Sequence, residues 1–272
     1  MNRRLTLLAA LAAVALSSCG FSDARQQALA EAAVQPLTLE NNWLPGLVGY
    51  ADYPAQGWGP VGYPGVSGGS SNIDPVQNFL EGLGLLDEEL PSGFSVSLLA
   101  DGDTLKTETL SFCGGAYPSE KLRVSRRQME ATAANSPFFF LSSELVQYLN
   151  ADDARQALTE LVSQKKQCPN GTSFTDVTGQ KQTIEFHAAP GPSSTVLLPV
   201  EDRAILHFTE KSNDGVFTYF MAVQIRGNTL SALYGVKSGA SELTQSELDF
   251  MYGLLSGMST RLMNAAASDI GL

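Results

Sequence analysis

The sequence lacks the short motifs that mark several large enzyme classes. It has no Gly-x-Ser-x-Gly turn, no Walker phosphate loop, no dinucleotide-binding glycine fingerprint and no His-Glu-x-x-His. It also contains only two histidines, His187 and His207, in 272 residues. These absences argue against the familiar hydrolases, nucleotide-dependent enzymes and zinc peptidases, and we expect a non-enzyme without a cofactor or a metal.

Basic residues are scarce as well. The chain has 17 Lys and Arg against 28 Asp and Glu, which gives a net charge of −11. Affinity for nucleic acid depends on neutralising phosphates with basic side chains. We therefore expect no nucleic-acid partner, and we expect repulsion from anionic lipid headgroups.

No stretch approaches the roughly 20 apolar residues that a transmembrane helix needs. The longest apolar run, Leu5 to Leu16, follows Arg3 and Arg4 and ends in Leu16-Ser17-Ser18-Cys19. This pattern resembles the signal and lipobox of bacterial lipoproteins. We predict a signal peptide over residues 1–18 and lipidation at Cys19, which would place the protein outside the cytoplasm, attached to the cell membrane by its N-terminal lipid. The alternative is an ordinary secretory signal with a chance cysteine.

Cysteines are few, and two remain once Cys19 carries lipid. An exported protein with one remaining pair favours a disulfide between Cys113 and Cys168. A metal site or a catalytic thiol is the alternative, but neither a nearby His ligand nor a protease signature accompanies the pair.

The region after the signal peptide differs in composition from the rest of the chain. Residues 24–34 fit a short helix, and residues 46–72 are rich in Gly, Pro, Ser and Tyr without periodicity. Such a composition buries too little apolar surface to fold alone. We predict a lipidated N-terminus and tether over 19–75 and a single domain over 76–272. The aromatic residues of the tether could instead bind the cell wall.

The domain has mostly strand-like patterns. Residues 94–100 and 105–112 flank Asp101-Gly102-Asp103, which predicts a hairpin. Interleaved Ser, Thr and aromatic residues favour strands over 123–131 and 138–149 rather than helices. The remaining predicted strands form a meander, at 183–188, 203–211, 216–226 and 229–236.

Two segments have helical periodicity. Residues 152–166 place apolar residues at helical spacing, with an acidic first turn and a basic last turn. Thr244-Gln245-Ser246-Glu247 is a capping box, and an apolar stripe from Leu248 to Leu262 follows it. The predicted fold class is α+β: an antiparallel, meander-rich sheet covered by two or more helices, with one disulfide.

Two groups of residues are candidates for a functional site. The first is the histidine pair. His187 alternates with Glu185 and should face solvent, whereas His207 alternates with Ile205 and should be packed and hydrogen-bonded. Together they could serve a serine nucleophile or a metal, although nothing in their spacing requires either.

The second group is basic: Lys121, Arg123, Arg126 and Arg127. Strand alternation places Arg123 and Arg127 on one face and Arg126 on the other. A buried Arg126 needs a carboxylate partner or an anionic ligand. A structural ion pair is the simpler interpretation, and ligand binding by Arg123, Arg126 and Arg127 is the functional one.

Several short runs resemble those of actinobacterial envelope sensor domains. They are Leu90-Pro91-Ser92-Gly93-Phe94, Cys113 to Glu120, Leu122 to Gln128, Glu144 to Tyr148 with Cys168-Pro169, and Val223 to Asn228. In combination, over roughly residues 76–265, the chain resembles the lipoprotein relatives of the extracellular sensor domain of PknH-type receptor kinases. The resemblance implies a compact antiparallel sheet with flanking helices, a disulfide and a cleft suspected of binding an unidentified ligand. This sequence contains no kinase domain and one expected disulfide where the kinase sensor has two, so signalling is not implied.

Three hypotheses follow. The first is a membrane-anchored extracytoplasmic lipoprotein with a non-catalytic, ligand-binding or sensor-like domain, whose partner is a small molecule, a lipid or a cell-wall compound. The second is an envelope hydrolase or esterase that uses a serine near His207. The third is a structural surface protein whose residues 46–72 grip the cell wall.

Overall fold

The computed structural model describes residues 75–106, 109–110, 112–134, 136–175, 181–188, 190–193, 195, 197, 200–213 and 215–272. The predicted signal peptide, Cys19, the helix at 24–34 and the tether lie outside the described residues. The N-terminal boundary of the predicted domain, near residue 76, is therefore still a prediction.

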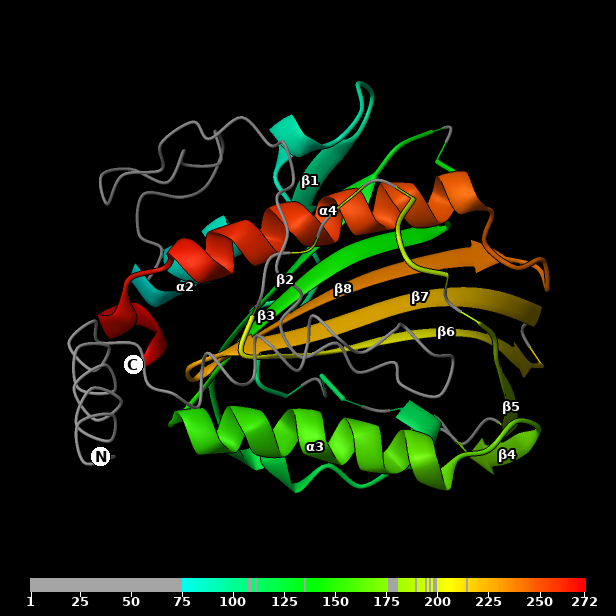
Figure 1. The fold of residues 1–272 in the computed structure, drawn as a ribbon, viewed down its shortest axis with the longest axis horizontal. Coiled ribbons are helices and arrows are strands. Elements are labelled where there is room, and N and C mark those ends of the chain that lie inside the picture. The colour runs from blue at the N-terminus through cyan, green and yellow to red at the C-terminus, as the bar shows by residue number, and fades with distance from the viewer. Residues whose placement is uncertain are drawn as a thin grey trace, which may run out of the picture.

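The described part of the chain is built on one antiparallel sheet of eight strands, in the order β1-β2-β3-β8-β7-β6-β5-β4. The strands are β1 (Ser95–Leu98), β2 (Arg123–Thr132), β3 (Phe140–Tyr148), β4 (Thr172–Thr175), β5 (Lys181–Phe186), β6 (Asp202–Ser212), β7 (Gly215–Arg226) and β8 (Thr229–Ser238). The helices are α2 (Pro75–Leu83), α3 (Ala151–Gln167) and α4 (Gln245–Asn264), with short 3₁₀ turns η1 (Asp87–Glu89), η2 (Phe112–Gly114), η3 (Pro118–Leu122) and η4 (Ala267–Ile270). Figure 1 shows three layers, with α4 and α2 on one face of the sheet and α3 on the other. The predicted α+β class is confirmed.

The predicted meander is present as β5, β6, β7 and β8, which pair in sequence order. Its last turn requires glycine. Gly227 has φ +56°, and a Cβ there would lie 2.0 Å from the carbonyl oxygen of Ile270. The turn therefore brings the C-terminal residues against the sheet, where the Asn228 N–H donates to the same carbonyl at 2.7 Å.

One face of the sheet is covered by α4. The predicted capping box is present: the Thr244 side chain accepts from the Glu247 N–H, and the Glu247 carboxylate accepts from the Thr244 N–H. The apolar stripe packs against β7 and β8 at Phe220, Ala222 and Leu233. Its buried members are Leu248, Met251, Tyr252, Leu255, Met258 and Leu262.

The opposite face is covered by α3. The Asn150 side chain accepts from the Asp153 N–H and begins the helix, as N-cap residues do. Its buried residues, among them Leu158 and Leu161, pack on Val223 of β7. The disulfide Cys113–Cys168, with a Cα–Cα distance of 6.4 Å, joins η2 to the end of this helix. The predicted pairing is confirmed.

The predicted hairpin between 94–100 and 105–112 is wrong. β1 pairs with β2 instead, and none of the described residues from Thr104 to Leu110 is in a strand. The backbone near the predicted turn is bonded to β2, since the Gln128 N–H donates to the Gly102 carbonyl at 2.8 Å. Asp101 in the predicted turn and Leu105 after it supply their carbonyl oxygens to buried arginines. A hairpin partner strand would need such carbonyl groups for its own ladder.

Among the α-helices and strands of the described residues, two were not predicted from the sequence. The first is α2, which packs Phe79, Leu80 and Leu83 against the end of α4. The second is β4, a four-residue edge strand paired only with β5. Both are short, and short elements offer little periodicity to detect.

Candidate functional site

The arginine cluster lies on β2, and a β-bulge changes the faces that simple alternation predicts. The pairing register of β2 with β3 shifts between Arg123 and Ser125. After this shift, Arg123 and Arg126 share the α3 face, and Arg127 points to the other face. The predicted grouping of Arg123 with Arg127 is therefore wrong, because a bulge inserts one residue and reverses the alternation after it.

Arg126 is buried in an ion pair with Glu144 of β3, both side chains being 2% exposed. Its Nε donates to the Glu144 carboxylate, and its Nη1 donates to the Asp101 carbonyl at 3.0 Å. Its Nη2 donates to the Gln128 side-chain oxygen. Each guanidinium nitrogen thus already has an acceptor within the chain, and the ion-pair interpretation holds for Arg126.

Glu144 is the centre of this network. Its carboxylate accepts from the Thr109 hydroxyl at 3.1 Å and from the Tyr234 hydroxyl at 3.0 Å, besides Arg126. Burial and the adjacent carboxylate raise the pKa of Tyr234 well above its usual value. Tyr234 is therefore a neutral phenol that donates to Glu144. The only charges in this network at Glu144, those of Glu144 and Arg126, neutralise each other.

Arg123 extends the network away from the sheet. Its guanidinium donates to Thr109 at 2.9 Å and to the Leu105 carbonyl at 2.9 Å, and it pairs with Glu120 at 3.0 Å. Glu120 in turn accepts the backbone N–H groups of Thr109 and Leu110. Arg123 thus fixes the segment that follows β1, which also contacts Arg126.

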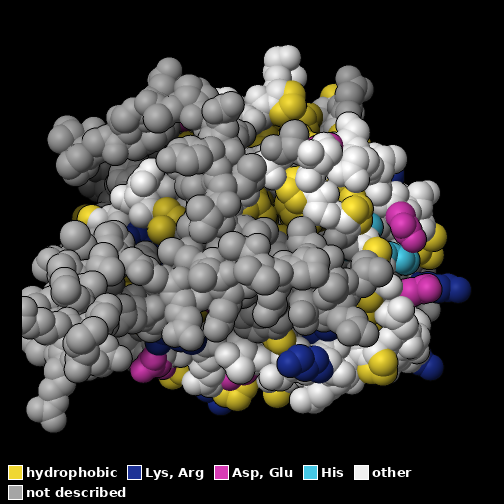
Figure 2. Space-filling model, viewed as in Figure 1, with side chains coloured by type: hydrophobic (Ala, Val, Ile, Leu, Met, Phe, Trp, Pro, Cys, Tyr) yellow, Lys and Arg dark blue, Asp and Glu magenta, His cyan; other side chains and the backbone are white. Residues whose placement is uncertain are grey.

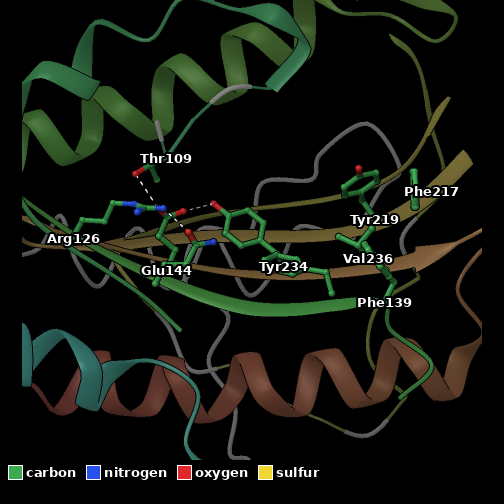
Figure 3. A pocket seen from close by; sticks show the side chains of 10 residues that line it. Thr109, Arg126, Phe139, Glu144, Phe217, Tyr219, Tyr234 and Val236 are labelled. Atoms are coloured by element: carbon green, nitrogen blue, oxygen red, sulfur yellow. Dashed lines mark hydrogen bonds and ion pairs between the residues drawn. The ribbon is translucent and has the colours of Figure 1, made fainter. Parts of the chain in front are cut away.

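A cavity of about 410 Å³ opens beside this network on the α3 face. Figure 3 shows Thr109, Arg126 and Glu144 at one end, Tyr234 in the middle, and Tyr219, Phe217, Val236 and Phe139 at the other. The rings of Phe139 and Phe217 lie 6.0 Å apart, and Phe139 is 73% exposed. The cavity is therefore aromatic and apolar, with a single polar end.

The three predicted ligand-binding arginines do not all reach this cavity. Arg126 lines it, and Arg123 touches it only through Thr109. Arg127 lies on the opposite face, where it pairs with Glu81 of α2. Ligand binding by these residues is still a prediction, and the geometry brings only Arg126 to the cavity.

The histidines form a separate group. His207 is buried as predicted, and its Nδ1 lies 3.1 Å from the Ala188 carbonyl, which can only accept. The Leu243 N–H points to the other ring nitrogen at 3.5 Å. Burial is the main cause that lowers the pKa of His207. Both ring nitrogens therefore face backbone groups rather than a serine hydroxyl.

His187 differs from its prediction. Its Nε2 lies 2.6 Å from the Thr209 hydroxyl, its Nδ1 lies 3.4 Å from the Glu242 carboxylate, and the side chain is 14% exposed. It follows β5 rather than belonging to it, so strand alternation does not fix its direction. Figure 2 shows histidine at the surface of this side of the molecule, with acidic and basic side chains nearby.

The described residues show neither a metal site nor a membrane span. No three His, Cys, Asp or Glu side chains among them are placed to hold a metal ion. Within the same residues, no helix is both long enough and apolar enough to cross a bilayer.

Most of the cavity lining was not predicted from the sequence. Its aromatic and aliphatic lining comes from alternate residues of neighbouring strands, Phe217 and Tyr219 of β7 with Tyr234 and Val236 of β8. The available signal was the period-two spacing of these residues, which places them on one face. That signal does not reveal that α3 leaves this part of the face uncovered.

Fold and site together define an α+β domain with a ligand-sized apolar cavity on the face of its sheet that α3 covers only in part. No family model matches the chain, and no curated protein matches it. Among solved structures, the chain is similar to the extracellular domain of PknH from Mycobacterium tuberculosis. The identity is 12% and the TM-score is 0.41, over 71% of this chain and 100% of that chain. A likeness this distant says nothing about what the present chain binds.

Proposed function

We propose that this chain is a membrane-anchored, extracytoplasmic lipoprotein whose domain binds a small, uncharged, apolar molecule without converting it. The sequence Leu16-Ser17-Ser18-Cys19 supports the anchor. The Cys113–Cys168 disulfide fits an oxidising compartment outside the cytoplasm.

The cavity itself supports binding most directly. Its volume of about 410 Å³ lies within the range of small-molecule sites, roughly 300–1,000 Å³. Aromatic and aliphatic side chains line most of it, with a few hydrogen-bonding groups at one end, which is the usual composition of such sites.

The polar end favours an uncharged ligand. Arg126 and Glu144 neutralise each other, and Thr109 and Tyr234 are already hydrogen-bonded to the same carboxylate. An anionic group placed there would be repelled by the Glu144 carboxylate. The cation among the lining residues, Arg126, is already paired with Glu144. The anionic group would lose its hydration without compensation.

The hydrolase hypothesis finds no support at its key residue. His207 would have to accept a proton from a serine hydroxyl, but its two ring nitrogens face the backbone of Ala188 and Leu243. The wall-binding hypothesis depends on residues 46–72, which lie outside the described residues.

A matched pair of fluorescent probes tests the proposal. N-phenylnaphthylamine is neutral, and anilinonaphthalene sulfonate has the same ring system with an added sulfonate. The full chain is held through its own lipid in phosphatidylcholine nanodiscs, with empty nanodiscs as the background for membrane partition. We expect the neutral probe to bind above this background and the sulfonate to bind at least about tenfold more weakly.

Two variants test whether the probe binds in the cavity. Val236→Phe adds a ring to the cavity and should abolish neutral-probe binding, because Val236 lines it. Val124→Phe is the matched control on the same sheet, at a side chain that is 45% exposed, and should leave binding unchanged. Equal binding by both variants would contradict the cavity as the site, and failure of the parent chain to float with the nanodiscs would contradict the anchor.

A further inference from the structure

A second cavity of about 270 Å³ adjoins the first on the same face of the sheet. Its apolar lining comes from β4, β6, β7 and η2, at Phe174, Phe208, Met221 and Phe112. It shares three lining residues with the first cavity, which are Thr109, Tyr219 and Tyr234. The two cavities are therefore separated by little more than the side chains of these residues.

The two tyrosines of this partition stand on neighbouring strands. Tyr219 pairs with Val236 and Tyr234 pairs with Met221, so the tyrosines are diagonal neighbours across β7 and β8. Diagonal neighbours have Cβ atoms about 7–8 Å apart or somewhat less, within reach of aromatic side chains, so the two rings form the partition side by side. A slender group can pass between two such rings more readily than a bulky one.

The two tyrosines are held to different degrees. Tyr234 donates to the buried Glu144 carboxylate at 3.0 Å. Tyr219 donates to the half-buried Glu210 at 3.4 Å, near the limit of a hydrogen bond, and stacks on Phe208 with ring centroids 4.7 Å apart. Tyr219 is therefore the member of the partition that moves at lower cost.

The far cavity also differs from the near one in what encloses it. η2 contributes Phe112 and Cys113 to its lining, and the disulfide ties η2 to the end of α3. This wall is covalently fixed, whereas the near cavity ends at the exposed ring of Phe139. The second cavity is therefore bordered by a covalently tied wall, and the first by an exposed aromatic ring.

We propose that the ligand is a linear, uncharged hydrocarbon chain with a hydroxyl or ester head, which lies in the first cavity and extends past Tyr219 into the second. This inference rests on the proposed binding function and specifies its ligand class. A compact ligand would fill one cavity only, whereas a chain buries apolar surface in both.

Photo-crosslinking in the full chain tests this arrangement. Two long-chain fatty alcohols carry a diazirine, one near the hydroxyl and one near the methyl end. Each is supplied free in solution, or as the monoacylglycerol of the corresponding diazirine-labelled fatty acid incorporated into the bilayer, to phosphatidylcholine vesicles that hold the lipidated protein. After irradiation, peptide mapping locates the label. We expect the two probes to label opposite cavities, so that one labels peptides with Phe139 or Val236 and the other labels peptides with Phe112 or Phe174. Labelling by the ester alone would assign the chain to a membrane lipid, and labelling by the free alcohol would show that no membrane source is required.

Variants in each cavity and in the partition test whether the labelling depends on the proposed path of the chain. Met221→Phe fills the second cavity and Tyr219→Trp enlarges the partition, so both should reduce labelling around Phe112 and Phe174 at least about fivefold while labelling around Val236 persists. Val236→Phe should reduce labelling in both cavities. If both probes label only the first cavity in the parent chain, a chain that spans the two is ruled out while binding itself stands. If neither cavity is labelled, the proposed function fails as well.

Discussion

The two faces of β7 are buried to different extents along the same strand. On the face toward α4 every inner residue is fully buried, at Thr218, Phe220, Ala222 and Gln224. On the face toward α3 burial decreases along the strand, from Ile225 at 0% and Met221 at 6% exposure to the half-exposed Tyr219 and Phe217. The helices therefore complete one face of the sheet and leave part of the other uncovered.

This difference separates the parts of the molecule that stabilise it from the part available for binding. The α4 face contains the packed apolar cluster around Phe220 and the α4 stripe, reinforced by the ion pair of Arg261 with Glu89. The open end of the α3 face leaves aromatic surface partly exposed at Phe217 and Tyr219. Each Å² of apolar surface that stays exposed to water loses about 25 cal/mol of the stabilisation that burial would give. An apolar cavity maintained at that cost is a common property of binding sites.

The sharpest test of this comparison uses two phenylalanines of one strand. Phe220→Ala on the closed face should lower the free energy of unfolding by about 3–5 kcal/mol, because it leaves a cavity in a packed core. Phe217→Ala on the open face should cost below about 1 kcal/mol, because its ring already borders empty space and solvent.

Urea unfolding of the full chain in nanodiscs measures both values. In the binding assay the order should reverse, with Phe217→Ala weakening the neutral probe and the folded fraction of Phe220→Ala binding it normally. Equal losses of stability at the two positions would show that the open face contributes to folding as much as the closed one.

The disulfide stabilises the partly covered face. It closes a loop of 55 residues between Cys113 and Cys168. In the loop-entropy model, the double variant Cys113→Ser, Cys168→Ser should lose roughly 4 kcal/mol of unfolding free energy. Because Cys113 lines the second cavity, the variant should also lose labelling of that cavity by the chain probes.

The control is the parent chain treated with reductant, which should match the double variant in thermal midpoint. Normal labelling of the second cavity in a folded double variant would show that the disulfide is not needed to enclose it.

The sequence predicted the closed face better than the open one. The stripe from Leu248 to Leu262 and the capping box at Thr244 are local patterns, and the helix that they predict is present as α4. The meander was equally local, since short turns connect its strands. Local periodicity is sufficient to predict the elements of a sheet face that one helix covers.

The open face depends on contacts between residues distant in sequence. The need of Arg126 for a carboxylate was predicted, but its identity as Glu144 depends on the register of β2 with β3. The bulge at Val124 then reversed the expected faces of Arg123 and Arg127. The hairpin prediction failed for a related reason, because the segment after β1 accepts hydrogen bonds from Arg123 and Arg126 instead of pairing with β1.

The smallest predicted effect is a pH dependence of opposite sign on the two faces. Asp202 shares the α3 face with Ile225, and burial, with Glu201 adding to it, raises its pKa from 3.8 to about 6. Between these values the folded state binds a proton that the unfolded state does not. Asp202 therefore adds stability as the pH falls from about 6 to about 4.

His207, on the α4 face, acts in the other direction. Burial lowers its pKa, and the neighbouring His187 adds to this shift, so below pH about 6.5 the unfolded state binds the proton more readily. Stability contributed by His207 is thus lost as the pH falls. The two contributions oppose each other in the parent chain and can be separated by substitution.

Thermal midpoints of the full chain between pH 4 and 7 distinguish the two groups. Asp202→Asn removes the group that gains a proton on folding, so its midpoint should fall more steeply than that of the parent as the pH decreases through about 6. His207→Gln removes the opposite dependence and should fall less steeply. If both variants changed the slope in the same direction, one of the two burial assignments would be wrong. Opposite changes would show that the fully covered face excludes a charged imidazole, while the partly covered face keeps a buried carboxyl protonated at mildly acidic pH.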